Sequence, residues 1–309
     1  MLKNKIAKFL LKLVISLVFI AWLVFKIDWK EVLFYLQKIS LWQIILYVVV
    51  LITGMIISAY KWRILAQFKG FKVSLAKCFQ LYLAGTFINN IMPSFIGGDT
   101  YKAYQIGKEE KKYVSAAATV IVDRITGLIG AMILSVIFAA LNWKVVASHE
   151  ILLIILAIVF LTLATLVIIV VIAKFSFWQK VFQFMPKKII EVIKDFTEYK
   201  NDKSTLLKVL LLAIIYNFIG LAVVNYILFI GLGIQVGILN YLTVIFLISI
   251  VSSIPVSVNN IGIKEWAYVT FFGFFGVASP AVVAVALLSR VIQMIVSFAA
   301  LPEYLKNKK

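Results

Sequence analysis

The chain has 309 residues, of which 63% are hydrophobic, with a mean hydropathy of +1.05 and a formal net charge of +18. Several apolar runs approach the roughly 20 residues that cross a bilayer, which excludes an ordinary soluble domain and indicates an integral membrane protein. In a soluble protein this positive charge would suggest nucleic acid. Here the lysines cluster between the apolar runs, so we expect anionic membrane lipids, and no nucleic acid, as partners.

We predict an all-α polytopic membrane protein with about six transmembrane helices. The uninterrupted spans are Phe9–Phe25, Leu41–Tyr60, Tyr113–Leu141, Ile151–Ala173, Leu206–Ile230 and Ala281–Leu301. The first resembles the apolar part of a signal peptide, but it lacks a clear cleavage site and leads into further spans, so we expect it to be retained. No Gly/Ser linker or shift in composition divides the sequence, and residues 1–309 are predicted to form a single integral membrane domain.

Two further apolar segments, about Leu75–Ile96 and about Leu239–Phe275, are interrupted by Pro, Gly and Asn residues. If each one enters and leaves through the same face, as a re-entrant hairpin, every lysine-rich cluster lies on one side of the membrane. Making only one of them a full crossing would put the basic clusters of the two halves on opposite sides. The positive-inside rule therefore predicts two re-entrant helical hairpins in the cell (cytoplasmic) membrane, with cytoplasmic N- and C-termini.

The longest linker, about residues 174–205, alternates aromatic and aliphatic residues with lysines. Such a pattern is typical of one or two amphipathic helices on the cytoplasmic surface, held there by anionic lipids. A solvated linker is the alternative, and the sequence leaves both open.

The two interrupted segments share a downstream pattern of one acid and one arginine. Asp99 precedes Arg124 by 25 residues, and Glu265 precedes Arg290 by the same number. In the predicted topology the spans that carry these arginines run in opposite directions, which makes the repeat an inverted one. Its units are about residues 41–141 and 206–301. Repeated breaks in membrane-length segments point to the binding site of a transporter.

Both arginines are predicted to lie near the middle of the bilayer. Arg124 lies about three helical turns beyond Tyr113, and Arg290 lies equally far beyond Ser279. At 1.5 Å per residue, each is roughly 16 Å deep in a hydrocarbon core roughly 30 Å thick. An isolated arginine at that depth costs at least about 2.5–3.5 kcal/mol, so each needs a partner.

Two kinds of partner are compatible with the sequence. One is a neighbouring acid, which can be Asp99, Asp123 or Glu265; the arginines would then pin the hairpins to the helices. The other is the phosphate of a lipid, which a guanidinium can bind in bidentate fashion. The acids would in that case orient the arginines or meet a cationic head group. Capping of a helix first turn is the alternative role for Asp99 and Glu265.

The apices of the hairpins supply amide groups, small side chains and unpaired backbone groups. Non-helical backbone at membrane depth is tolerated only where it is buried in protein or lines a wet cavity. Each apex also leads into a new helix, whose free N–H groups favour an anion. The candidate apex residues are Asn89, Asn90, Pro93, Ser94, Gly97, Gly98, Pro255, Ser257, Asn259, Asn260 and Gly262.

Four motifs together resemble a known family. They are MPSFIGGDTYKAY, ending at Tyr104, the VDR of 122–124, IGIKEWA, ending at Ala267, and the LLSR of 287–290. They are similar to the lysylphosphatidylglycerol synthase transmembrane family, the flippase-like membrane region of the multiple peptide resistance factor. The resemblance covers nearly the whole chain and implies movement of a phospholipid, such as lysyl-phosphatidylglycerol, between leaflets. The synthases carry a cytoplasmic acyltransferase-like domain after this region, whereas this sequence stops at Lys309, so we expect no aminoacyl-lipid synthesis.

Three functions are therefore considered. The first is a phospholipid translocator, with Arg124 and Arg290 as the phosphate ligands. The second is the membrane component of a phosphatidylglycerol lysyltransferase system that acts with a separate catalytic domain, and the third is a small-solute or ion transporter. A second copy of the chain and a separate synthase are the candidate protein partners. Because Cys78 and His149 are the only cysteine and histidine, we expect no Cys/His metal site, and we predict no cofactor and no catalytic residue.

Overall fold

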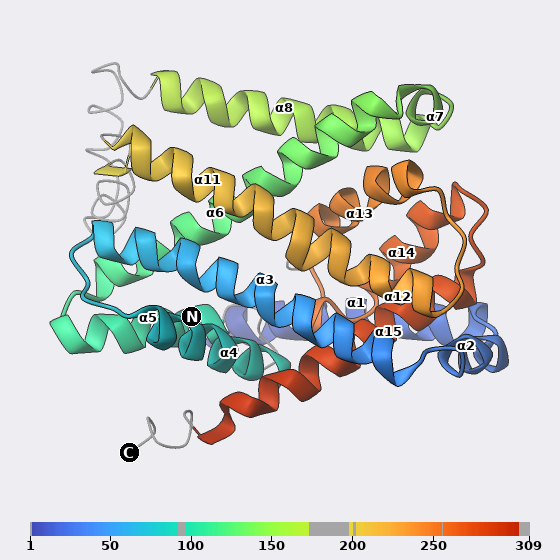
Figure 1. Ribbon diagram of the computed structural model, residues 1–309, viewed down its shortest axis with the longest axis horizontal. Helices are drawn as coiled ribbons and strands as arrows, with labels where there is room; N and C mark the ends of the chain where they lie inside the picture. Colours follow the sequence, from blue (N-terminus) through green and yellow to red (C-terminus); the bar gives the residue numbers. More distant parts are fainter. Residues whose placement is uncertain (1, 92–96, 173–197, 200–201, 255, 303–309) are drawn as a thin grey trace.

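A computed structural model describes residues 2–91, 97–172, 198–199, 202–254 and 256–302. All regular secondary structure in this part of the chain is helical, which confirms the all-α prediction (Figure 1). The elements are α1 (Leu2–Lys26), α2 (Trp29–Leu36), α3 (Leu41–Phe68), α4 (Leu75–Ile91), α5 (Gly97–Glu110), α6 (Tyr113–Leu141), α7 (Trp143–Ala147), α8 (Glu150–Ile172), α11 (Lys203–Tyr216), the π-helix η2 (Asn217–Val223), α12 (Val224–Gly231), α13 (Ile238–Ser252), η3 (Val258–Asn260), α14 (Ile263–Gly273), α15 (Ser279–Ser297) and η4 (Phe298–Ala300). The amphipathic linker and the residues Pro93, Ser94 and Pro255 lie outside the described residues.

Four helical stretches in the described residues are long and apolar enough to cross a membrane. They are Leu41–Phe68, Tyr113–Leu141, Lys203–Gly231 and Ser279–Ala300, and they match four of the six predicted spans. The other two predicted spans, Phe9–Phe25 and Ile151–Ala173, fall on α1 and α8. The part of α1 from Leu10 meets α2 at 86°, so these two helices make a fifth span only if the bent pair is counted as one, and the described apolar part of α8, Glu150–Thr165, is shorter than a span. The structure therefore supports a multi-pass membrane protein, and the count of six remains a prediction.

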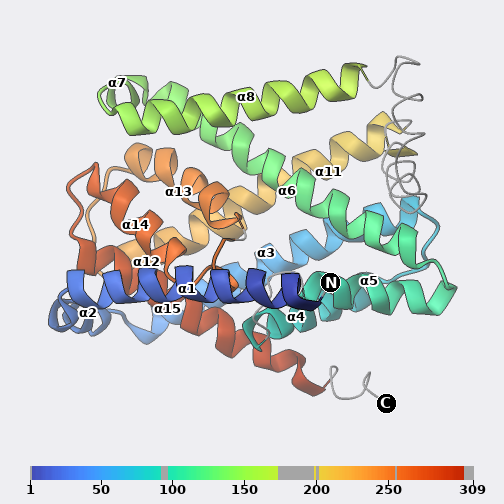
Figure 2. The ribbon, with the colours of Figure 1, turned by 180° about the vertical axis from the view of Figure 1, so that it is seen from behind.

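Each interrupted segment forms a pair of antiparallel helices. The first pair is α4 with α5 and the second is α13 with α14, and the two pairs point toward each other from opposite ends of the molecule (Figures 1 and 2). The second pair turns through residues with positive φ: Asn259 (49°), Asn260 (55°) and Gly262 (86°). A right-handed helix cannot continue through such a backbone, which explains why this apolar segment reverses here.

The helices of the two halves run in opposite directions. Along the long axis, α3 runs against the continuous stretch α11–η2–α12, and α6 runs against α15 (Figure 1). The contacts between the halves are also equivalent: the long helix α6 packs on α13 of the second hairpin, and the long helix α15 packs on α4 of the first hairpin. The loops after α3 and α5 and the start of α11, which carry the basic clusters, all lie at one end.

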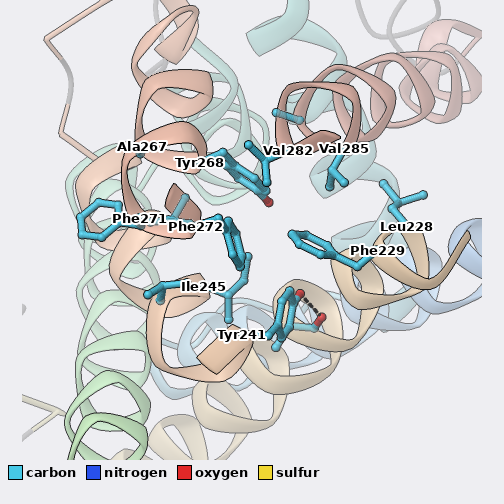
Figure 3. Close-up of a cluster of buried hydrophobic side chains, with 14 of the residues drawn as sticks. Leu228, Phe229, Tyr241, Ile245, Ala267, Tyr268, Phe271, Phe272, Val282 and Val285 are labelled. Carbon is cyan, nitrogen blue, oxygen red and sulfur yellow. Dashed lines mark hydrogen bonds between the residues drawn. The ribbon is translucent and has the colours of Figure 1, made fainter. Parts of the chain in front are cut away.

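The largest apolar core holds the second hairpin in place. Tyr241 of α13 and Phe272 of α14 stack at 5.9 Å between ring centroids, next to Phe229 of α12 (Figure 3). The buried hydroxyl of Tyr241 donates to the backbone oxygen of Ala222 at 2.7 Å, which satisfies the one polar atom of that ring. This core therefore packs both helices of the second hairpin against α12.

A π-helical segment interrupts the span Lys203–Gly231, a feature that the sequence did not predict. The side-chain amide of Asn217 donates to the backbone oxygens of Ala213 (2.8 Å) and Gly127 (2.9 Å), so it ties the start of the segment to α6. Gly220, within the segment, lies against Gly54 of α3: a Cβ built on Gly54 would be 2.6 Å from the Cα of Gly220. Small residues allow this close approach of two helices.

Substitution of Gly54 by alanine is expected to destabilise the protein by about 1–3 kcal/mol, the usual cost of overpacking, because the added methyl meets backbone and not a flexible side chain. The matched control is Gly273→Ala, since a Cβ at this helical position meets nothing within 4 Å. Thermal unfolding of the two purified variants in detergent checks the prediction. Equal melting temperatures for both variants would contradict the proposed close contact.

Candidate functional site

The two predicted arginines each form an ion pair with the matching acid of their own half. Nε of Arg124 lies 2.5 Å from Oδ2 of Asp99, and an Nη of Arg290 lies 2.8 Å from Oε1 of Glu265. Because α6 begins at Tyr113 and α15 at Ser279, both arginines lie about three turns from the start of their helices. Each pair thus joins a hairpin to the long helix that comes after it.

The pair in the second half also organises the hairpin turn. Glu265 accepts a hydrogen bond from the backbone N–H of Gly262 (2.8 Å), as a first-turn acid does, and its side chain is only 3% exposed. Arg290 donates to the backbone oxygens of Asn259 (3.2 Å) and Asn260 (3.4 Å). Helix α1 covers the same turn, since the hydroxyl of Ser16 accepts from the N–H of Val258 at 2.7 Å.

The pair in the first half has a second cation. The other carboxylate oxygen of Asp99 lies 3.0 Å from Nζ of Lys102. At the apex, the side-chain oxygen of Asn89 accepts from the N–H of Gly98 (2.8 Å), and the amide of Asn90 donates to Ser297 (2.9 Å) at the end of α15. Asn90 therefore connects the first hairpin to the second half of the chain.

Asp123, considered as a partner of the arginines, belongs to a different cluster. Its Oδ1 lies 3.1 Å from Nζ of Lys61, which also donates to the backbone oxygen of Asp123 at 2.8 Å. Its Oδ2 accepts a hydrogen bond from the hydroxyl of Tyr82. The side chain of Lys61 is 2% exposed, so this is a buried ion pair between α3 and α6.

A cavity of about 390 Å³ brings these groups together. Five cationic side chains line it, and Asp123 is the one acid among its lining residues. Both halves contribute to its wall, including the apex asparagines of both hairpins. The lining residues are Ser58, Lys61, Tyr82, Thr86, Asn89, Asn90, Lys102, Asp123, Arg124, Gly127, Tyr216, Asn259, Asn260, Lys264, Arg290 and Gln293. The remaining described apex candidates, Gly97, Gly98, Ser257 and Gly262, shape the turns and do not line this cavity.

Three lysines of this wall were not predicted as site residues: Lys61, Lys102 and Lys264. Lys264 donates to the hydroxyl of Ser289 at 2.9 Å, and its ammonium lies 5.8 Å from the ring centroid of Tyr268. The available signal was its position beside Glu265 inside an otherwise apolar hairpin, because a lysine in the membrane needs a function or a partner. Lys61 gave a weaker signal, since it lies at the end of a predicted span where a lysine can also reach the surface.

Comparison with known proteins assigns the chain to a family. The family model described as the "Lysylphosphatidylglycerol synthase TM region" matches residues 9–300. The chain belongs to this family. Within the family it is similar to two proteins of Methanocaldococcus jannaschii. UPF0104 membrane protein MJ1595 is 26% identical over 316 aligned positions, covering 96% of this chain and 93% of the relative. UPF0104 membrane protein MJ1078 is 26% identical over 228 positions, covering 72% and 95%. No solved structure matches the chain.

Removal of the two arginines is expected to have unequal effects on stability. Arg290→Ala leaves Glu265 buried without its cation and removes the hydrogen bond to the backbone oxygen of Asn259. We therefore expect the free energy of unfolding to fall by about 3–5 kcal/mol. Arg124→Ala leaves Asp99, which is 15% exposed, with Lys102 as a remaining partner. We therefore expect a smaller decrease in the free energy of unfolding. Thermal unfolding of both variants measures the difference.

The double variant Arg290→Ala/Glu265→Gln is the internal control for that comparison. It removes the uncompensated carboxylate and should recover part of the stability lost in Arg290→Ala, because most of the cost is the buried charge. An Arg124→Ala variant less stable than Arg290→Ala would contradict the assignment of the stronger structural role to the second pair.

Proposed function

We propose that the chain is a phospholipid translocator, which moves a phosphate-bearing lipid between the leaflets of the membrane. The observation that carries the proposal is the cavity that both hairpins share, in which Arg124 and Arg290 face a common space together with three lysines. A guanidinium offers five N–H donors in a planar fork that fits phosphate oxygens. The phosphate of the lipid binds between the two arginines, whose ion pairs with Asp99 and Glu265 stay in place, while the acyl chains stay in the bilayer.

Charge balance supports an anionic ligand. The cations of the cavity are Lys61, Lys102, Arg124, Lys264 and Arg290, and their carboxylate partners are Asp99, Asp123 and Glu265. Five positive and three negative groups leave a net charge of +2. Lys264 has a hydroxyl and an aromatic ring as its partners, which makes it a third ligand for the phosphate.

The proposal includes the full topology of six spans and two re-entrant hairpins in an inverted repeat. The opposite helix directions in the two halves support it, as does the gathering of the basic loops at one end (Figure 1). With the positive-inside rule, that end is cytoplasmic. The loop between α6 and α8 then lies outside, and the arginine of each half is reached from a different side of the membrane.

Two single-cysteine variants test the orientation. In a Cys78→Ala background, Ser148→Cys should react with a membrane-impermeant maleimide added to intact cells, because its loop lies at the end without basic clusters. Lys111→Cys should react only after the membrane is opened, since it follows α5 at the basic end. Labelling of both positions from the same side would contradict the topology.

Reconstitution tests the transport activity. Vesicles that contain the protein and phospholipid with a fluorophore on one acyl chain are treated with dithionite, which quenches label only in the outer leaflet. We expect transbilayer movement above that of protein-free vesicles, and at least about a tenfold reduction in Arg124→Lys and Arg290→Lys, because lysine keeps the charge but loses the bidentate geometry.

The third arginine of the chain supplies the matched control. Arg63 donates to the backbone oxygen of Val73 and does not line this cavity, so Arg63→Lys should move lipid at the wild-type rate. If Arg124→Lys and Arg290→Lys also keep the wild-type rate while folded, the phosphate-binding role is wrong and these residues only hold the hairpins.

A further inference from the structure

A second cavity of about 370 Å³ adjoins the charged one and differs from it in chemistry. The two share five residues: Arg124, Tyr216, Asn260, Lys264 and Gln293. Beyond this shared wall, the polar groups of the second cavity are the amide of Asn225 and the hydroxyls of Ser249, Ser252, Ser253 and Tyr268. No acid is among its lining residues. The rest of its wall is apolar or glycine: Leu51, Gly220, Leu221, Ile245 and Ile248.

Two polar atoms in this wall are buried without a hydrogen-bond partner in the described part of the chain. They are the side-chain oxygen of Asn260, whose residue is 8% exposed, and the hydroxyl of Ser252. Leaving such a group unpaired destabilises the folded state, so proteins rarely tolerate it without a reason. The oxygen of Asn260 accepts only, so it requires a donor, and the hydroxyl of Ser252 takes either role. A ligand that carries hydroxyl groups satisfies both.

Each acid of the site already has partners within the protein. The two oxygens of Asp99 face Lys102 and Arg124, and those of Glu265 face Arg290 and the N–H of Gly262. The two oxygens of Asp123 face Lys61 and the hydroxyl of Tyr82.

Of the described residues, Asp123 is the one acid that lines either cavity, and Lys61 already lies beside it, so a cationic head group would find no carboxylate that lacks a cation. It would instead meet the ammonium of Lys264, which lines both of them, as well as the two arginines. Like charges at such close range repel each other.

We infer that the transported lipid is a net-anionic phosphodiester whose head group is uncharged and hydroxyl-bearing, of the glycerol or sugar kind, and that a cationic aminoacyl head group is disfavoured. The inference rests on the proposed translocator function. The phosphate lies in the first cavity between the arginines, and the hydroxyls of the head group extend into the second cavity toward Asn260 and Ser252. The shared wall at Lys264 is the point where the phosphate joins the head group.

Four lipids test the roles of head-group hydroxyls and head-group charge separately in the vesicle assay. Each is labelled on an acyl chain so that its head group is native. Phosphatidylglycerol and phosphatidylinositol each carry one phosphodiester charge and more than one hydroxyl, of the glycerol and sugar kind respectively. Phosphatidylethanol has the same phosphodiester and no head-group hydroxyl, and lysyl-phosphatidylglycerol adds positive charge through an ester to one hydroxyl of the same glycerol. We expect phosphatidylethanol and lysyl-phosphatidylglycerol to move at least about tenfold more slowly than the better of the first two, as the loss of one buried hydrogen bond or a like-charge contact implies.

The Ser252→Ala variant tests whether the preference for hydroxyl-bearing head groups comes from the second cavity. Because this hydroxyl has no partner in the described part of the protein, its removal leaves no other group there unpaired, and the variant should fold. It is expected to reduce the ratio of the phosphatidylglycerol rate to the phosphatidylethanol rate at least about threefold. Ser148→Ala, which removes a serine hydroxyl from an exposed loop outside both cavities, should leave that ratio unchanged.

The outcomes distinguish this inference from the function on which it rests. If no lipid moves faster than in protein-free vesicles, the translocator proposal itself fails. If lipids move but lysyl-phosphatidylglycerol is as fast as phosphatidylglycerol, the exclusion of cationic head groups is overturned. If phosphatidylethanol equals both hydroxylated lipids and Ser252→Ala changes no ratio, the second cavity does not bind the head group, and an acyl chain is its occupant.

Discussion

An arginine in apolar surroundings must be neutralised locally, and the architecture of this protein depends on that constraint. Each half places one arginine about three turns into a long helix, and each supplies the compensating acid from the first turn of the hairpin helix before it. The acid can reach the arginine only if the chain reverses within the molecule, so the ion pair and the hairpin depend on each other. The same contact fixes the helix start, the turn and the position of the cavity between them.

The two halves share this ion pair but differ in the residue that precedes each arginine and in the partner of that residue. Arg124 and Arg290 occupy corresponding positions, and the residue before each one is Asp123 in the first half and Ser289 in the second. Asp123 binds Lys61, which comes from a neighbouring long helix, whereas Ser289 accepts from Lys264, which comes from the hairpin itself. The first half therefore carries a buried ion pair where the second carries a neutral hydrogen-bond acceptor, and the cavity between them is chemically asymmetric.

The sequence predicted the parts of the site that depend on spacing along one helix. The positions of both arginines along their helices and the apex asparagines were predicted, because helical rise and turn-forming residues are local properties, and Asp99 and Glu265 were among the acids considered as partners. The contribution of Lys61 and Tyr82 depends on how α3 and α4 pack against α6, which no local pattern encodes. The 86° bend between α1 and α2 has a visible cause in Asp28, which caps α2, but its angle is set by packing and was missed.

The π-helical segment changes the rotation of the helix faces along the span Lys203–Gly231. Because π-helices place more residues in each turn than the 3.6 of an α-helix, the faces of α11 and α12 are rotated relative to each other about a common axis. The two parts accordingly have different neighbours: α11 packs on α3 and α6, and α12 packs on α3 and α15. Removing one residue from 217–223 would let the segment rewind toward an ordinary helix while α12 keeps nearly its present orientation, because fewer residues then turn through a similar total angle. The wide turns of the segment thus accommodate an extra residue within the span without changing which side of α12 meets α3 and α15.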